Sequence, residues 1–238
     1  MSQTSREKSL EELIAIMGIC EFEKVDEVEK PASFKEVFTR IDPSRYYLLV
    51  AYDQENSPVC WFVLKGPKFT RGYCEAIDQS SPYVIEKLSE TVSVSRVTLY
   101  RLIPPTEYYG EHWKLGHEEI DRQHSNILEK WNELVYGVIE GREDLVKTLE
   151  ELITTVHHHL DYEEGLMKRY KYPYMKSHVK EHEYLRGALK EIARLAKVKG
   201  VLAAMVEEMG FVEAYIDHFH RQDSSLVAYL KMVESIRR

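Results

Sequence analysis

The 238-residue chain lacks the features that mark several common classes of protein. It has no apolar run approaching about 18 residues, and its N-terminal apolar stretch is short and flanked by charges, so we expect neither a membrane span nor a signal peptide. Lysine and arginine (32) are outnumbered by aspartate and glutamate (40), which leaves a net charge of −8. Such a chain has no general affinity for nucleic acid or anionic membranes. We therefore expect a cytoplasmic protein with neither kind of partner.

Cysteine is also scarce. Cys20, Cys60 and Cys74 are odd in number, show no CxxC spacing and lie far from the histidine-rich half of the chain. This pattern predicts reduced, partly buried thiols rather than disulfides or zinc ligands, which agrees with a cytoplasmic setting. The same N-terminal part has no glycine-rich phosphate loop and no nucleophile with a recognisable partner.

Histidine is absent from the first 111 residues, whereas all ten histidines lie between His112 and His220. Pro104 and Pro105 interrupt the pattern just before this change in composition. The two signals together predict a domain boundary. We expect a small domain over residues 1–103, a linker over 104–111, and a second domain over 112–238.

The first domain is predicted to be α+β. Apolar residues recur with helical period from Ser9 to Met17, and two apolar runs flank the turn-forming segment DQENSP, which indicates a hairpin. The expected helices are Ser9–Met17, Phe34–Ile41 and Tyr83–Thr91, and the expected strands are Tyr46–Tyr52, Val59–Leu64, Gly72–Ile77 and Val92–Leu102. A free edge of this sheet is a candidate surface for a protein partner.

The second domain is predicted to be an all-α up-down four-helix bundle with a C-terminal helical extension, because long helical patterns alternate with short breaks. The expected helices are Ile120–Ile139, Asp144–Tyr170, Tyr174–Lys197 and Val201–His218, followed by a shorter piece at Leu226–Ile236.

Metal-capable side chains recur on every predicted helix of the bundle. His159 with Glu163, and His178 with His182, lie four residues apart and so share a helical face. The other candidates are His124, His218 and Asp223. Zinc is usually satisfied by four ligands and often recruits thiolates, whereas five imidazoles and two carboxylates suit a pair of iron ions.

Four motifs carry a resemblance to a known family: ID-x-QH at Ile120–His124, H-x-x-x-E-E at His159–Glu164, YP followed by H-x-x-x-H, and H-x-x-x-x-D at His218–Asp223. In type and order they resemble the bacterial or archaeal branch of the hemerythrin family, over roughly residues 110–225. The resemblance implies that His178, His182 and His218 hold one iron and that His124 and His159 hold the other. It also implies bridging by Glu163, Asp223 and a solvent-derived oxygen, with an open position for dioxygen on the iron that has two histidines.

The spacing of five between His218 and Asp223 does not fit one face of a regular α-helix, since it turns about 140° further round. We therefore expect a helix end or a π-type distortion there.

One departure from the family concerns a residue beside the predicted site. Tyr215 stands at a pocket position where the family has an aliphatic residue, and its phenol is expected either to act on a bound oxygen ligand or simply to pack. Ile127, Leu160 and Phe219 are expected to supply an apolar lining. Asp121 is expected to orient a ligand or to cap its helix.

The function expected from these residues is reversible binding of dioxygen for sensing, storage or delivery, by a binding protein rather than an enzyme. Two alternatives remain open at this point. One is a di-iron oxidase, peroxidase or nitric-oxide-handling enzyme, and the other is an iron-responsive regulatory module whose partner binds residues 1–103.

Overall fold

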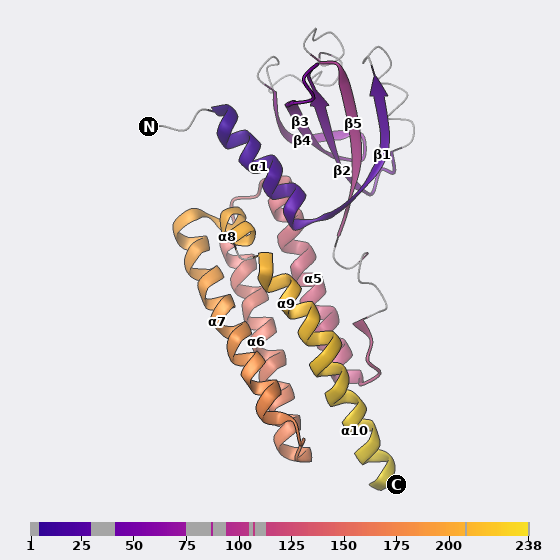
Figure 1. Ribbon diagram of the computed structural model, residues 1–238, viewed down its shortest axis with the longest axis vertical. Coiled ribbons are helices and arrows are strands. Elements are labelled where there is room, and N and C mark those ends of the chain that lie inside the picture. Colours follow the sequence, from indigo (N-terminus) through magenta and orange to yellow (C-terminus); the bar gives the residue numbers. More distant parts are fainter. Residues whose placement is uncertain are drawn as a thin grey trace. The chain divides into compact units, whose positions relative to one another are not determined.

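The computed structural model describes residues 5–29, 41–74, 87, 94–104, 107, 113–207 and 209–237 (Figure 1). The chain separates into two compact units: residues 1–104 with 139–141, and residues 105–138 with 142–238. Within the described ranges, no helix combines the length and the apolar character needed to cross a membrane.

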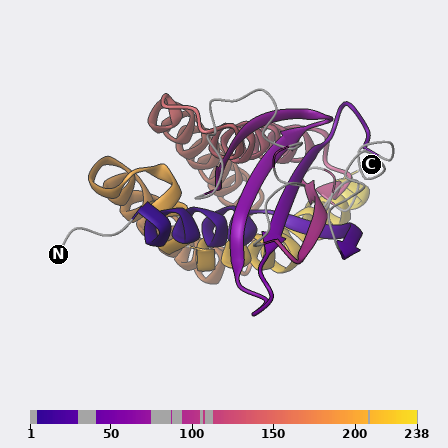
Figure 2. The same cartoon turned by 90° about the horizontal axis from the view of Figure 1, so that it is seen from above.

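An antiparallel sheet forms the first unit. Its strands run in the order β1-β5-β2-β3-β4, and they twist and curve visibly in Figure 2. The strands are β1 (Glu21–Glu29), β2 (Tyr46–Tyr52), β3 (Pro58–Lys65), β4 (Lys68–Cys74) and β5 (Arg96–Ile103), and helix α1 (Ser5–Ile19) precedes them. The α+β class, the hairpin of β2 with β3, and the strand at β5 are confirmed.

Strand β2 is the centre of this unit's core, because its sequence YYLLVAY is buried along almost its whole length. Tyr47, Leu49 and Ala51 join one apolar cluster with residues of β3, β4 and β5. Elsewhere in the unit, the indole Nε1 of Trp61 donates to the carbonyl oxygen of Ser9 at 3.1 Å and to its hydroxyl at 2.8 Å. These bonds tie α1 to β3.

Strand β1 was not predicted, because its sequence EFEKVDEVE is highly charged and breaks the alternation of a half-buried strand. The pairing of β1 with β5 shifts register between Lys24 and Asp26, so Val25 occupies a β-bulge. Val25 and Val28, three residues apart, consequently both pack on the core. Strand β4 begins four residues before the predicted Gly72–Ile77. The helices predicted at Phe34–Ile41 and Tyr83–Thr91 lie outside the described residues, apart from Ile41 and Lys87.

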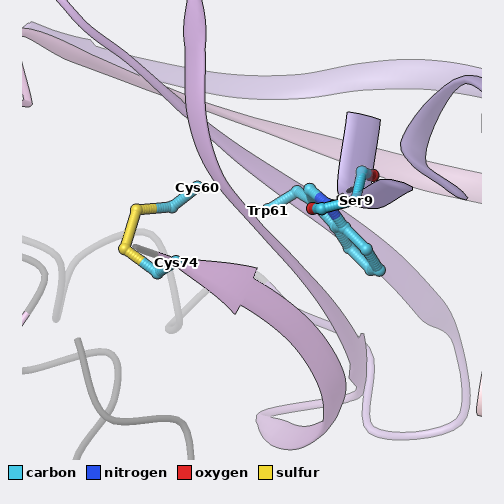
Figure 3. The surroundings of a disulfide bond; sticks show 4 residues. All are labelled: Ser9, Cys60, Trp61 and Cys74. Atoms are coloured by element: carbon cyan, nitrogen blue, oxygen red, sulfur yellow. Dashed lines mark hydrogen bonds between the residues drawn. A yellow bond between two sulfur atoms is a disulfide. The ribbon is translucent and has the colours of Figure 1, made fainter. Parts of the chain in front are cut away.

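The prediction of three reduced thiols is wrong for two of them. Cys60 and Cys74 are directly opposed on β3 and β4, with their Cα atoms 4.3 Å apart, and a disulfide joins them (Figure 3). The chain separation of 14 residues matches no motif, so only the strand register reveals the pair. Cys20 is the free, buried thiol that was predicted.

Long helices form the second unit, and the predicted bundle is confirmed. They are α5 (Glu118–Glu140), α6 (Leu145–Tyr170), α7 (Met175–Lys199), and a fourth made of α9 (Met209–His218), the π-helix η3 (Phe219–Asp223) and α10 (Ser224–Arg237). The short helix α8 (Val201–Glu207) contacts α7 and α6. The predicted end of the fourth helix at His218 is wrong: the helix continues through η3 into α10, so the expected extension Leu226–Ile236 is part of it (Figure 1).

Local signals end the helices where the site requires a turn. Lys171 adopts a left-handed conformation with φ of 55°, and the backbone N–H of Tyr172 donates to the carbonyl of Met167 at 2.9 Å. Pro173 then prevents continuation of α6. After α7, Gly200 has φ of 90°, a conformation that glycine adopts without strain.

Candidate metal centre

Seven donor side chains converge inside the bundle, and each is at most 1% exposed. These are the residues predicted from the sequence: His124, His159, Glu163, His178, His182, His218 and Asp223. Nitrogen and oxygen atoms of these side chains approach one another closely enough to surround metal ions. Full burial of so many ionisable groups is costly unless they are paired or bind cations.

Helical spacing positions the donors on each element. His159 and Glu163 lie one turn apart on α6, and His178 and His182 lie one turn apart on α7, so each pair projects from one face. His124 comes from α5. The donor residues therefore lie on the buried faces of their helices, and the site lies in the core of the bundle.

The π-helix η3 brings the last donor into line. His218 ends α9 and Asp223 ends η3, five residues later. A π-turn places residues five apart on one face, because its hydrogen bonds run from i to i+5. His218 Nε2 consequently lies 3.0 Å from Asp223 Oδ1. The predicted π-type distortion is confirmed.

The donors form two groups that share Asp223. Glu163, His178, His182, His218 and Asp223 make one group, here called the three-histidine group, and His124, His159 and Asp223 make the other, the two-histidine group. Asp223 Oδ1 lies 3.3 Å from His178 Nε2, whereas its Oδ2 lies 3.4 Å from His124 Nε2 and 3.6 Å from His159 Nε2. One carboxylate thus offers a separate oxygen to each group.

Glu163 also stands between the groups. Its Oε2 lies 3.4 Å from Nε2 of both His178 and His182, and 3.7 Å from His159 Nε2. Both carboxylates therefore face imidazoles from more than one helix.

The carboxylates are held ionised. Burial alone would raise the pKa of Asp223, but the charge of His218 and the other imidazoles close to the carboxylate hold it well below its ordinary value. Burial would lower the pKa of His178, yet the carboxylates of Asp223 and Glu163 close to its Nε2 raise it to about 9. Two buried anions need compensating positive charge, which imidazole protons or metal ions can supply.

Several donor atoms make no ordinary hydrogen bond. Both carboxylate oxygens of Glu163, both of Asp223, and Nε2 of His182 are buried without a hydrogen-bond partner in the described part of the chain. Buried polar atoms are normally paired, so such a set suits cations. Neutral nitrogen donors with two carboxylates, and no thiolate, are a donor set that iron accepts.

Side chains beside the donors hold the imidazoles from outside. His159 Nδ1 lies 3.2 Å from Gln123 Oε1, His182 Nδ1 lies 3.2 Å from Glu164 Oε1, and His218 Nδ1 lies 3.1 Å from Glu181 Oε2. In each case the acceptor is next in sequence to a donor on one helix, and it supports a histidine of the following helix. Such contacts fix ring orientation and tautomer.

An aromatic wall covers the two-histidine group. The ring of Phe219 contacts His124 edge-on at a centroid distance of 4.8 Å, and Trp113 stacks on Phe219 at 4.5 Å. Tyr215 stacks on Trp113 at 6.1 Å, and its hydroxyl is buried without a hydrogen-bond partner among the described residues. Phe219 and Tyr215 thus both belong to this aromatic wall.

The remaining predicted residues have plainer positions. Ile127 and Leu160 are fully buried in the bundle. Asp121 accepts hydrogen bonds from the backbone N–H groups of Leu115 and Gly116 at 2.7 and 2.9 Å, so it anchors the segment before α5. His158 and His220 are exposed, as expected for histidines outside the donor set.

Sequence reasoning missed the supporting residues Gln123, Glu164 and Glu181, and also Trp113. A usable signal existed for the first three, since each is a polar residue directly beside a donor in the chain. Trp113 precedes the first bundle helix and shows no periodic pattern, so only the fold reveals its contact with His124.

Comparison with known proteins agrees with this geometry. The family model described as "Hemerythrin HHE cation binding domain" matches residues 115–230. Two proteins named bacteriohemerythrin, from Campylobacter jejuni serotypes O:6 and O:2, are each 27% identical over 119 residues, which is 48% of this chain and 88% of theirs. No solved structure matches the chain. Residues 115–230 therefore form a domain of the hemerythrin family.

Proposed function

We propose that residues 112–238 bind two iron ions and, through them, bind dioxygen reversibly for sensing, storage or delivery. The three-histidine group would hold one ion and the two-histidine group the other, and Glu163 and Asp223, which face imidazoles of both groups, would contribute to both positions. Nitric oxide or peroxide are further ligands of the same kind.

One observation carries the proposal: the two oxygens of Asp223 face different histidine groups. A bridging carboxylate needs that arrangement, whereas a single ion would be satisfied by the donors of the three-histidine group alone. The unequal donor count also matters, because a position with fewer protein donors leaves room for an external ligand.

When the two iron ions are bound to the protein, they supply the electrons for the uptake of dioxygen. The side chains supply the remaining requirements. Neutral imidazoles and two carboxylates leave a centre of low net charge. Phe219 and Trp113, with Ile127 and Leu160 in the surrounding core, exclude water and slow proton access.

Tyr215 is proposed as the polar contact of the external ligand. Its hydroxyl stays protonated, because burial and the Asp223 and Glu163 carboxylates raise its pKa well above the ordinary value. A protonated phenol donates a hydrogen bond. With no proton acceptor beside it among the described residues, the same phenol is poorly placed to lose a proton on oxidation.

Metal analysis with visible spectroscopy tests the proposal. The full chain, purified from iron-supplied cells, should contain two iron ions and show a visible absorption that appears with air and disappears under argon. Protein without iron would exclude the proposal, and so would iron whose spectrum does not respond to oxygen.

His178→Ala provides the matching variant, and His158→Ala the control. The first removes a buried donor of the three-histidine group and should abolish most iron binding, whereas the second changes an exposed histidine of the same bundle. Equal iron content in both variants would contradict the assignment of His178.

An enzyme is the second candidate, because a buried phenol, Tyr215, belongs to the aromatic wall over the two-histidine group, even though no proton acceptor lies beside it among the described residues. If the phenol takes part in redox chemistry, Tyr215→Leu should slow autoxidation and the protein should turn over peroxide or nitric oxide when given an electron donor. Autoxidation that the substitution does not slow would leave the oxygen-binding role.

Residues 1–103 are proposed to be a separate domain that binds a protein partner, joined to the bundle by residues 104–111. Iron-dependent but oxygen-independent binding of a partner would indicate a regulatory module instead. A cytoplasmic location is also retained as a proposal, but the cysteines no longer support it, because structural disulfides are rare in that compartment.

A further inference from the structure

The five donor histidines are supported unequally at their outward ring nitrogens. Carboxylates accept from two histidines of the three-histidine group: Glu164 faces His182 at 3.2 Å, and Glu181 faces His218 at 3.1 Å. In the two-histidine group, His159 faces only the amide oxygen of Gln123, at 3.2 Å. Nδ1 of His124 and of His178 has no hydrogen-bond partner within the described residues. Both charged acceptors thus belong to one group.

The two carboxylate acceptors are themselves fixed. Arg186 Nη1 donates to Glu164 Oε1 at 2.8 Å, and the other end of the same guanidinium binds Asp161 at 2.6 Å. Gln222 Nε2 donates to Glu181 Oε1 at 2.6 Å. These bonds limit the side-chain rotation that would otherwise remove the acceptors from their histidines.

Gln123 is fixed as well, in the orientation that makes it a neutral acceptor. Its Nε2 donates to Glu119 Oε1 at 2.7 Å, so its Oε1 turns toward His159. The difference between the groups is therefore one of charge at the acceptor and not of disorder.

A carboxylate that accepts from an imidazole N–H pushes electron density toward the opposite nitrogen and makes it a stronger donor to a metal. A neutral amide does so less, because hydrogen bonds to ionised acceptors are about twice as strong as neutral ones. The three-histidine group therefore has both more donors and more basic ones.

We propose that Glu164 and Glu181 make the three-histidine group the tighter cation position, so that it fills first and the two-histidine group fills second. The inference rests on the proposed metal-binding function. Glu164 and Glu181 act as positioning residues, through His182 and His218, and Gln123 leaves the second position weaker.

Addition of Co²⁺ to the metal-free full chain tests the order of filling. Absorption bands of bound Co²⁺ and calorimetry together should resolve two steps of one ion each, the first tighter than the second. His124→Ala should abolish the second step and leave the first.

Variants of the acceptors test the cause. Glu164→Gln and Glu181→Gln keep an acceptor oxygen but remove its charge, and each should weaken the first step about 10- to 100-fold while the second is unchanged. Gln123→Glu should tighten the second step alone. Glu183→Gln is the control, since Glu183 is an exposed carboxylate beside His182 in the chain.

Two results would overturn the inference. One is a single step that fills both positions at equal affinity, and the other is a first step that Glu164→Gln and Glu181→Gln weaken no more than Glu183→Gln does. Circular dichroism of each metal-free variant checks folding, and the two acceptors lie on different helices, so either suffices if the other misfolds. A wild-type chain that binds no Co²⁺ would instead reject the proposed function itself.

Discussion

The hydroxyl of Tyr215 is buried in an environment that does not stabilise it. It is 2% exposed, and its O–H has no hydrogen-bond partner among the described residues. Leaving such a group unpaired typically costs about 1–3 kcal/mol. Phenylalanine would fill the same space without that cost, so the hydroxyl has no stabilising role in the metal-free fold.

Tyr215→Phe should therefore leave the stability of the metal-free protein unchanged or raise it by about 1 kcal/mol, as measured by urea unfolding. The same variant should bind azide at least about tenfold more weakly in its oxidised, iron-loaded form, because a hydrogen bond to a charged group contributes roughly 1.5–3 kcal/mol. Absorbance during azide addition measures this affinity. Lower metal-free stability with unchanged azide binding would assign the hydroxyl a structural role.

The cysteines give a second prediction at this scale. Cys20 is 8% exposed, and burial raises its pKa to about 12. Its thiol should react with a maleimide very slowly in the native protein and rapidly after unfolding, since the thiolate is the reactive form. Mass spectrometry should find one labelled cysteine in unfolded, unreduced protein and three after reduction. Three labelled residues without reduction would contradict the Cys60–Cys74 disulfide.

At the scale of the elements, η3 keeps the buried residues of α9 and those of α10 on the same face of the fourth helix. His218 lies before it, Phe219 and Asp223 are its first and last residues, and Leu226 and Leu230 lie after it, all of them buried. A single residue added to a helix turns everything beyond it by about 100°. The π-turn therefore determines which face α10 presents to the bundle core.

An alanine inserted between His220 and Arg221 should consequently abolish cooperative unfolding of the bundle and its metal binding, because Asp223 and α10 would rotate away. Deletion of His220, an exposed residue, should be tolerated far better, since a spacing of four fits a regular α-helix. Thermal unfolding followed by circular dichroism measures both. An alanine added after Arg238 controls for chain length. Equal effects of the insertion and the deletion would contradict the proposed role of η3 in orienting Asp223 and α10.

The elements also show what the sequence could predict. The donors were found because helical spacing is local: His159 with Glu163, and His178 with His182, lie one turn apart in the chain. The acceptors of their imidazoles were not, because each bond crosses between helices and depends on packing. Strand β1 was missed because the bulge at Val25 breaks its alternation, and the Cys60–Cys74 pair because strand register is not a local property.

At the scale of the whole molecule, the two compact units depend on different covalent and ionic links. All three cysteines belong to the first unit, whereas the seven donors belong to the second. A disulfide that closes a loop of this length, with a chain separation of 14, stabilises by about 3 kcal/mol. A cation held at about a thousand times its dissociation constant stabilises by about 4 kcal/mol.

Calorimetry of the iron-loaded protein should therefore show two transitions that respond separately. A chelator should lower only the transition of the bundle, and the double variant Cys60→Ala, Cys74→Ala should lower only the other. Wild type with magnesium added serves as the control for ionic strength. A single transition that shifts with both treatments would mean that the units unfold as one.

The near-complete burial of the seven donors also has a kinetic consequence. No donor is more than 1% exposed, so an ion can leave only when helices part. The rate of ion release should then be limited by the opening of the bundle and not by the encounter with a chelator. The rate at which EDTA removes Co²⁺ should become independent of EDTA concentration, and it should rise steeply with temperature, as unfolding rates do.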